Sequence, residues 1–116
     1  MNTARRGALS EKIAVKFLEQ LGQRIMFKSV RVRFQSIDFD NHFDIVSIDP
    51  NDKTWIFSQI KTNCGNIKKE IGRLREWKKN NLPKDSKNKV WLLNYRTKGK
   101  KKGLILEYRS ELNPTS

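Results

Sequence analysis

The stretch HFDIVSIDPNDKTWIFSQIKT, residues 42–62, decides the fold because it contains two strand patterns around a tight turn. The turn is the run Pro-Asn-Asp-Lys at residues 50–53, whose residue types favour a change of chain direction. With these four residues as the hairpin loop, the numbers of paired residues sum to 103, which sets Asp44 opposite Gln59. An acid and an amide are therefore expected side by side, with Lys61 two residues further along the same face.

The hydrophobic pattern outside this hairpin predicts two helices and three further strands. Apolar residues recur at helical spacing over residues 3–21, which Gly22 follows, and again over residues 66–82, which Pro83 follows. Two-residue alternation of apolar and polar residues predicts the strands. The predicted strands are residues 30–35, 42–49, 54–62, 90–95 and 104–108, with a polar turn over residues 36–41.

This order of elements, α-β-β-β-α-β-β, indicates an α/β fold in a single domain over residues 1–116. A chain of this length supports one hydrophobic core rather than two. Because the second helix can cross over between the third and fourth strands, the five-stranded sheet is expected to be mixed, with helices covering it.

Charge is the strongest signal in the composition, because 25 Lys and Arg residues outnumber 12 Asp and Glu residues and give a net charge of +13. Such a basic domain has the electrostatic character of a nucleic-acid-binding protein, and DNA is the expected partner. A solubilising surface and a helix that lies on anionic lipid are the alternatives.

The composition also bears on where the protein works. No apolar stretch is long enough to span a membrane, and the first residues lack the apolar region of a signal peptide. Cys64 is the only cysteine in the sequence, so an intramolecular disulfide is excluded. A cytoplasmic protein without a membrane partner is therefore expected.

The expected juxtaposition of Asp44, Gln59 and Lys61 suits phosphodiester hydrolysis. Carboxylate and amide oxygens bind hard cations, so Mg²⁺ or Mn²⁺ is the expected cofactor. Such a cation polarises a phosphoryl oxygen and lowers the pKa of a bound water, and a lysine stabilises the developing negative charge. Glu11 lies at the edge of the apolar stripe of the first helix, from which it could hold the outer waters of the metal.

Three short runs resemble the PD-(D/E)XK nuclease superfamily: RGALSE at residues 6–11, FDIV at residues 43–46 and QIK at residues 59–61. The likeness covers roughly residues 5–95 and is greatest to archaeal Holliday junction resolvases and to small nucleases of archaea and their viruses. It implies a restriction-endonuclease-like fold, a Mg²⁺-dependent endonuclease that cleaves DNA, and a homodimer. Most members carry Glu or Asp at the position of Gln59, although some branches, including the VRR-NUC type, carry Gln.

The resemblance also implies roles for individual residues: Glu11 is the acid on the helix, Asp44 the metal ligand of the second strand and Lys61 the catalytic lysine. The predicted catalytic residues are Glu11, Asp44, Gln59 and Lys61, and the predicted metal ligands are Asp44, Gln59, Glu11 and Ile60. The predicted DNA contacts are Arg5, Arg6, Lys68, Lys69, Arg73, Lys100, Lys101 and Lys102.

Each of these residues also has an ordinary structural interpretation. Asp44 could be a strand-end acid satisfied by nearby backbone, and Glu11 could pair with a neighbouring basic residue. Asp38 and Asp40 are interpreted as turn residues, with a contact of one of them to the metal left open. For function, the alternatives are an exonuclease or nickase acting on ends or single strands, and a binding-only basic module whose site has decayed through Gln59.

Overall fold

The structure, a computed structural model, describes residues 3–32, 35–40 and 42–110 of the chain. Along these residues the elements are α1 (Thr3–Gln20), β1 (Arg24–Lys28), β2 (Val30–Val32), β3 (Gln35–Ile37), β4 (Ile45–Asp49), β5 (Thr54–Thr62), α2 (Ile67–Asn81), β6 (Lys89–Arg96) and β7 (Gly103–Arg109). The main sheet and its two helices follow the predicted order, as α1, β1, β4, β5, α2, β6 and β7.

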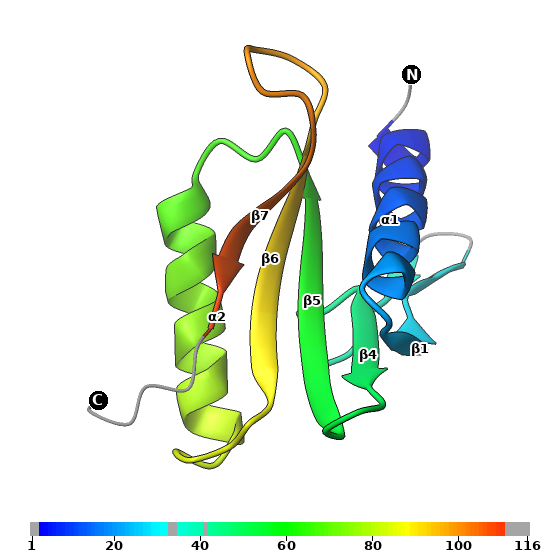
Figure 1. Cartoon of the computed structure of the whole chain (residues 1–116). Coiled ribbons are helices and arrows are strands. Elements are labelled where there is room, and N and C mark those ends of the chain that lie inside the picture. The colour runs from blue at the N-terminus through cyan, green and yellow to red at the C-terminus, as the bar shows by residue number, and fades with distance from the viewer. Residues whose placement is uncertain (1–2, 33–34, 41, 111–116) are drawn as a thin grey trace.

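The main sheet has five strands in the spatial order β1-β4-β5-β6-β7 (Figure 1). Neighbouring strands are antiparallel except β5 and β6, which run parallel and are connected through α2. A parallel pair needs such a crossover, whereas an antiparallel pair can be joined by a short turn. The prediction of an α/β fold with a mixed five-stranded sheet is therefore confirmed. Strands β2 and β3 form a separate two-stranded sheet.

The hairpin of β4 and β5 has the predicted register. Its ladder runs from Asp49 opposite Thr54 to Ile45 opposite Ser58, so the numbers of paired residues sum to 103. The Asp49 carbonyl accepts a hydrogen bond from Lys53 N–H at 2.8 Å, which closes the turn. Lys53 has a φ of 63°, the left-handed conformation that a tight hairpin turn requires. The turn therefore fixes which residues of the two strands face each other.

The first strand of the main sheet differs from the prediction. It is Arg24–Lys28, and not residues 30–35. Residues 30–35 alternate apolar and polar residues, whereas Ile25, Met26 and Phe27 of β1 are all apolar, so the alternation favoured the wrong segment. The chain leaves the main sheet at Ser29, and Val30–Val32 pairs with β3 in the small sheet instead. The part of the predicted strand at residues 33–34 lies outside the described residues.

The segment before β4 also differs from the prediction. Strand β3 occupies part of the expected turn over residues 36–41, and β4 begins at Ile45 rather than at residue 42. Between them, Phe39 and Phe43 exchange two backbone hydrogen bonds of 2.8 and 3.0 Å across a short turn. The chain thus makes a small hairpin just before the strand that carries the central motif.

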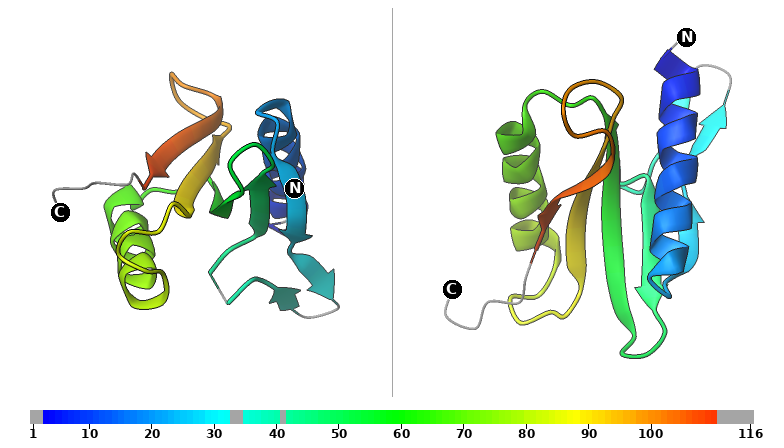
Figure 2. Two further views of the ribbon diagram at one scale, coloured as in Figure 1. Left: turned by 60° about the horizontal axis from the view of Figure 1, so that its bottom comes forward. Right: turned by 45° about the horizontal axis from the view of Figure 1, so that its top comes forward.

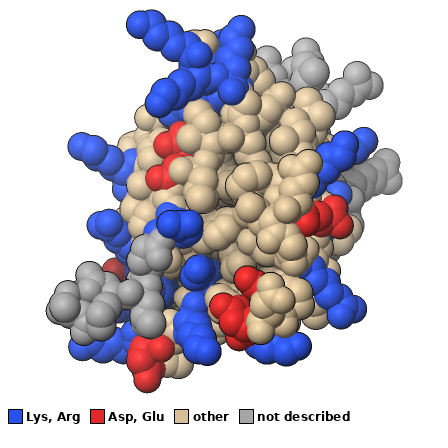
Figure 3. All heavy atoms as spheres, viewed as in Figure 1, with Lys and Arg blue, Asp and Glu red and all other residues tan. Residues whose placement is uncertain are grey.

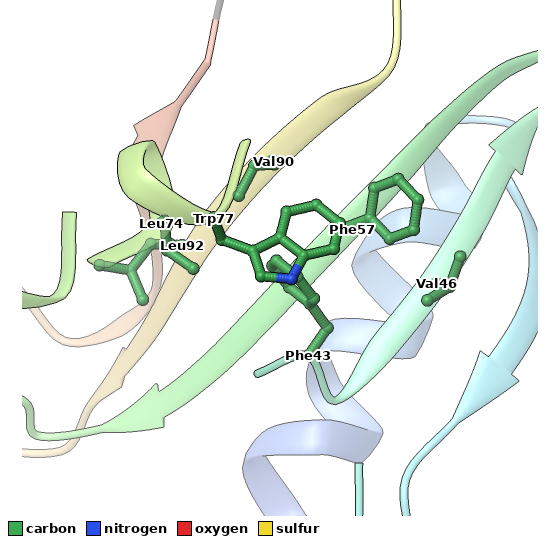
Figure 4. Close-up of a cluster of buried hydrophobic side chains, with 7 residues drawn as sticks. All are labelled: Phe43, Val46, Phe57, Leu74, Trp77, Val90 and Leu92. Carbon is green, nitrogen blue, oxygen red and sulfur yellow. The ribbon is translucent and has the colours of Figure 1, made fainter. Parts of the chain in front are cut away.

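The two helices cover opposite faces of the main sheet (Figures 1 and 2). The α1 cluster of buried residues consists of Ala14, Leu18, Ile45, Ile56, Trp91 and Leu93. The α2 cluster, shown in Figure 4, consists of Phe43, Val46, Phe57, Leu74, Trp77, Val90 and Leu92. Side chains alternate between faces along a strand, so Gln59 and Lys61 lie on the same face as Phe57, beneath α2.

The helix ends follow the signals in the sequence. Gly22 follows α1 with a φ of 86°, which residues other than glycine rarely adopt. Helix α2 begins after Asn66, whose side chain accepts a hydrogen bond from Lys69 N–H at 3.2 Å. It ends where Leu82 is extended, because Pro83 disfavours helical backbone at the residue before it. Neither helix in the described part of the chain is long and apolar enough to cross a membrane.

Candidate active site

Asp44 stands directly before β4, at a bend in the chain. Its N–H donates to the Ser58 carbonyl at 3.0 Å, and its carbonyl accepts from Ser29 N–H at 2.6 Å. The Oδ2 atom of Asp44 accepts a hydrogen bond from Ile60 N–H at 2.8 Å. These bonds hold the carboxylate against residues 58–60 of β5, next to Gln59. The expected juxtaposition of the acid with the QIK run is therefore present.

The electrostatic surroundings of Asp44 disfavour its negative charge. Burial raises the pKa of Asp44 to about 7, against the hydrogen bond from Ile60 N–H, which lowers it. The charges of Asp38 and Glu11 raise this pKa further, and the charge of Lys61 lowers it. The carboxylate thus lies where the nearby negative charge exceeds the positive charge. A cation bound here would remove that imbalance.

Gln59 is the second polar group at this place. The residue is 8% exposed, and its Oε1 atom is buried without a hydrogen-bond partner among the described residues. A buried oxygen in this condition costs about 1–3 kcal/mol of stability. An ordinary sheet hydrogen bond does not account for the Gln59 side-chain oxygen. A buried oxygen without a hydrogen-bond partner is suited to binding a ligand.

Glu11 reaches the site from α1 through Ser29. Glu11 is 4% exposed, and its Oε1 atom accepts a hydrogen bond from Ser29 Oγ at 2.7 Å. Ser29 is also the residue whose N–H donates to the Asp44 carbonyl, so it joins the helix to the bend before β4. A bond of 2.5 Å between Ser10 Oγ and Thr62 Oγ1 joins the same helix to the end of β5. The helix is thereby fixed beside the site at two points.

Lys61 has a partner that sequence reasoning missed. Its Nζ lies 3.9 Å from Glu70 Oε2 on α2, and the other oxygen of Glu70 lies 3.7 Å from Arg73 Nη1. The Glu70 side chain is only 12% exposed, whereas that of Lys61 is 34% exposed. Glu70 is the acidic residue in the first turn of a mostly basic helix, and this contrast was the signal available in the sequence.

The predicted DNA contacts fall into two exposed groups. Lys68, Lys69 and Arg73 are exposed on α2, and Lys100, Lys101 and Lys102 are exposed in the loop between β6 and β7. Figure 3 shows Lys and Arg side chains projecting at the end of the molecule where this loop lies in Figure 1. The side chains of Arg5 and Arg6 lie outside the described residues.

The base of the β6–β7 loop is tied to the end of β5. Asn63 Oδ1 accepts from Thr97 N–H at 2.9 Å, and Asn63 Nδ2 donates to Thr97 Oγ1 at 2.9 Å. Asn63 follows β5 directly, two residues after Lys61. This reciprocal pair therefore holds the basic loop at the end of the sheet that carries the candidate site.

A hollow of about 600 Å³ lies between α2 and the turn before β4. Its lining residues are Asp40, His42, Lys69, Gly72, Arg73, Glu76, Trp77, Asn80 and Asn81. The hydrogen bond of 2.7 Å from Trp77 Nε1 to Asp40 Oδ2 ties the two walls together. Two of the predicted DNA contacts, Lys69 and Arg73, line this hollow, whereas Asp44 and Gln59 do not. The hollow is therefore a neighbour of the candidate site and not the site itself.

The oxygen donors at the site fit a hard divalent cation. Among the residues that the structure describes, no three His, Cys, Asp or Glu side chains form a group that could hold a metal ion. The donors available from neighbouring residues include an amide: they are the Asp44 carboxylate and the unpartnered oxygen of Gln59, which lies between the two residues of β5 that bond to Asp44. Ile60 can contribute only its carbonyl, because its side chain is a hydrocarbon and its N–H is used by Asp44. Oxygen donors of this kind suit Mg²⁺ or Mn²⁺ and not a soft metal.

In comparisons with protein-family models, curated proteins and solved structures, nothing matches this chain.

Proposed function

We propose that this protein is a Mg²⁺- or Mn²⁺-dependent nuclease of restriction-endonuclease-like fold that hydrolyses phosphodiester bonds in DNA. One observation carries the proposal: Asp44 is hydrogen-bonded to Ser58 and Ile60, the residues on either side of Gln59, whose Oε1 is buried and has no partner among the described residues. Lys61 follows on the same face of β5. Two oxygen donors for a cation and one positive charge thus come from the bend before β4 and from β5, in a strongly basic protein.

The residues of the site would divide the work in the following way. Asp44 and Gln59 would hold the cation, which supplies Lewis-acid polarisation of a phosphoryl oxygen when bound. Lys61 would stabilise negative charge that develops on the phosphate, because its ammonium group is partly exposed and can reach a substrate. Glu70 would hold Lys61 in place between turnovers. Glu11 would act through Ser29, by fixing the bend at which Asp44 lies.

The net charge of +13 supports DNA as the partner, since basic side chains that neutralise phosphates release counterions. The exposed lysines of the β6–β7 loop and of α2 are the proposed contacts. A homodimer and a preference for branched DNA such as a four-way junction belong to the same proposal, because the resemblance to Holliday junction resolvases implies them. A cytoplasmic setting is part of the proposal because Cys64 is the only cysteine in the sequence, so that no disulfide can form within the chain.

The test is a cleavage panel of supercoiled plasmid, linear duplex, single strand and four-way junction, with Mg²⁺, with Mn²⁺ and with EDTA. We expect cleavage only with a cation, and loss of most activity in Asp44→Asn and Lys61→Ala while the fold is kept. Asp85→Asn, which removes one exposed negative charge, is the matched control. Full activity in EDTA would contradict the proposal, and the pattern of substrates separates an endonuclease from an exonuclease or nickase.

A second candidate is a binding-only module. It is favoured by the absence of a three-acid metal group among the described residues and by the neutral Gln59 at the centre of the site. This candidate predicts that the protein binds DNA and no Mn²⁺, and that it cleaves none of the four substrates. Cleavage by Gln59→Glu but not by the natural sequence would favour this reading of a decayed site.

A further inference from the structure

Asp38 lies beside Asp44, although the two are six positions apart in the sequence. Phe39 and Phe43 form a hydrogen-bonded pair on the two arms of the small hairpin before β4. The next residues outward on these arms are Asp38 and Asp44. In an antiparallel hairpin such residues are direct neighbours, whose Cβ atoms are typically about 4.5–5.5 Å apart. The hairpin therefore brings a second carboxylate to the candidate site.

The register of the two-stranded sheet also indicates that Asp38 lies near Asp44. In the small sheet the ladder ends where Val30 pairs with Ile37, and continuing it by one residue would set Ser29 opposite Asp38. Ser29 is the residue that donates to both Glu11 and the Asp44 carbonyl. Two independent pairings thus set Asp38 at the junction where β1, β3 and β4 meet.

Two side-chain oxygens of the residues that flank Asp44 are buried and lack a partner. They are Asp38 Oδ1 and Gln59 Oε1, both without a hydrogen-bond partner among the described residues. Asp44 lies between these two residues, with Asp38 on one side and Gln59 on the other. A buried carboxylate oxygen that accepts no hydrogen bond costs more free energy than a buried neutral oxygen in the same condition. Both oxygens and the Asp44 carboxylate would gain from the same cation.

We propose that Asp38 is a ligand of the divalent cation, and that it supplies the negative charge which Gln59 does not. This inference rests on the proposed function, since it concerns the metal of the same site. Hard cations bind more tightly as the number of charged oxygen ligands rises. The carboxylates of Asp38 and Asp44, together with the amide of Gln59, would give the site two negative charges without a third acid.

Asp40 does not serve the same purpose. Its Oδ2 atom accepts the hydrogen bond from Trp77 Nε1, so this acid is already used to hold the hairpin against α2. Asp38 differs from Asp40 in having an oxygen that no described residue satisfies. Asp38 and not Asp40 is therefore the proposed ligand of the metal.

The experiment measures Mn²⁺ binding to the DNA-free full chain by electron paramagnetic resonance and by calorimetry. The variants are Asp38→Asn, Gln59→Glu, the double variant with both changes, Asp44→Asn, and Asp85→Asn as an exposed charge control. We expect Asp38→Asn to weaken Mn²⁺ binding by about tenfold or more, and Gln59→Glu to tighten it. The double variant should return to near the natural affinity, because the charge has been moved from one ligand to the other.

The outcomes separate the inference from the proposed function. If the natural protein binds no Mn²⁺, the proposed function and the inference both fail. If Asp44→Asn abolishes binding while Asp38→Asn binds as the natural protein does, Asp38 is not a ligand and only the inference fails. Should Asp38→Asn not fold, substoichiometric Mn²⁺ added to the natural protein must broaden the NMR signals of Asp38, Asp44 and Gln59 before that of Asp85. Broadening that spares Asp38 would overturn the inference.

Discussion

At the scale of single residues, the ionised carboxylate of Asp44 destabilises the metal-free protein, and measuring stability as a function of pH can reveal this cost. The pKa of Asp44 is raised from the ordinary value of 3.8 to about 7 by burial, so the metal-free folded state disfavours the ionised form. The contribution of Asp44 to stability is complete below pH 3.8 and is lost as the pH rises to about 7. Asp44→Asn keeps an oxygen that can accept from Ile60 N–H but has no charge to bury.

We therefore expect Asp44→Asn to stabilise the metal-free protein above pH 7 and to leave its stability nearly unchanged at pH 4. The gain in the free energy of unfolding is at most about 4 kcal/mol, because each tenfold change in the acid dissociation constant corresponds to roughly 1.4 kcal/mol. Urea denaturation in EDTA at several pH values measures it, with Asp85→Asn as the control. A gain that is equal at all pH values would show that the charge of Asp44 is not its cause.

Glu70 offers a second test at the residue scale, because it holds the lysine that the proposed chemistry uses. Glu70→Gln removes the ion pair but keeps the size of the side chain, so Lys61 loses its fixed position. We expect the turnover rate kcat to fall by roughly tenfold, while KM for DNA stays the same or falls because a negative charge has gone.

Glu76→Gln is the matched control for Glu70, since Glu76 is an exposed acid on the same helix. Single-turnover and steady-state kinetics with the preferred substrate separate kcat from KM. Equal kinetics for the two variants would mean that Glu70 is a surface acid with no part in positioning Lys61.

At the scale of elements, α2 packs on the sheet through its buried residues Leu74 and Trp77, and Trp77 makes the aromatic contacts. This residue is 8% exposed and its ring lies 4.7 Å from that of Phe43 and 5.3 Å from that of Phe57, measured between centroids. Its Nε1 also holds Asp40 in the hairpin before β4. One side chain thus fastens both the helix and the hairpin that carries Asp38.

Trp77→Ala should lower the free energy of unfolding by about 3–5 kcal/mol, because it opens a cavity among aromatic rings. Trp77→Phe keeps most of the packing but loses the hydrogen bond to Asp40, and should cost about 1–2 kcal/mol. Trp55→Ala is the control, since Trp55 is 36% exposed and its loss should cost less than about 1 kcal/mol. Equal midpoints in urea for the Trp77 and Trp55 variants would contradict this account.

The turn at residues 50–53 allowed the register of the β4–β5 hairpin to be predicted, because a four-residue turn fixes which residues face each other. The first strand was predicted wrongly, because residues 30–35 alternate whereas Ile25, Met26 and Phe27 do not, and it is pairing with β4 that selects Arg24–Lys28. Glu70 was missed because it reaches Lys61 from another element, and no local spacing reveals such a contact. A metal contact of Asp38 stayed open in the sequence because it depends on the pairing of Phe39 with Phe43.

At the scale of the whole molecule, charge should govern affinity for DNA. Reversing Lys100, Lys101 and Lys102 to Glu should weaken binding to all DNA sequences alike. If each contacts one phosphate, the slope of log K against log salt should become shallower by about 3. Fluorescence anisotropy over a range of salt concentrations measures that slope.

The control for this experiment lies at the opposite end of the molecule. Lys79, Lys84 and Lys87 are exposed at the end of α2 and in the loop that follows it, far from the β6–β7 loop in Figure 1. Reversing these three changes the net charge by the same amount. If both triple variants lose affinity equally, the net charge and not a particular surface determines binding.

The two outer strands of the sheet have a consequence for self-association. Both outermost pairings contain a break in register, between Ile25 and Phe27 in β1 and between Leu92 and Leu93 where β6 meets β7. In β1, Arg24 and Lys28 are also exposed. Irregular, charged edges resist the addition of a further strand, which is how natural sheets avoid growing into fibrils. Two copies of this chain would therefore meet through a helix or a sheet face, and concentrated solutions should stay free of ordered aggregates.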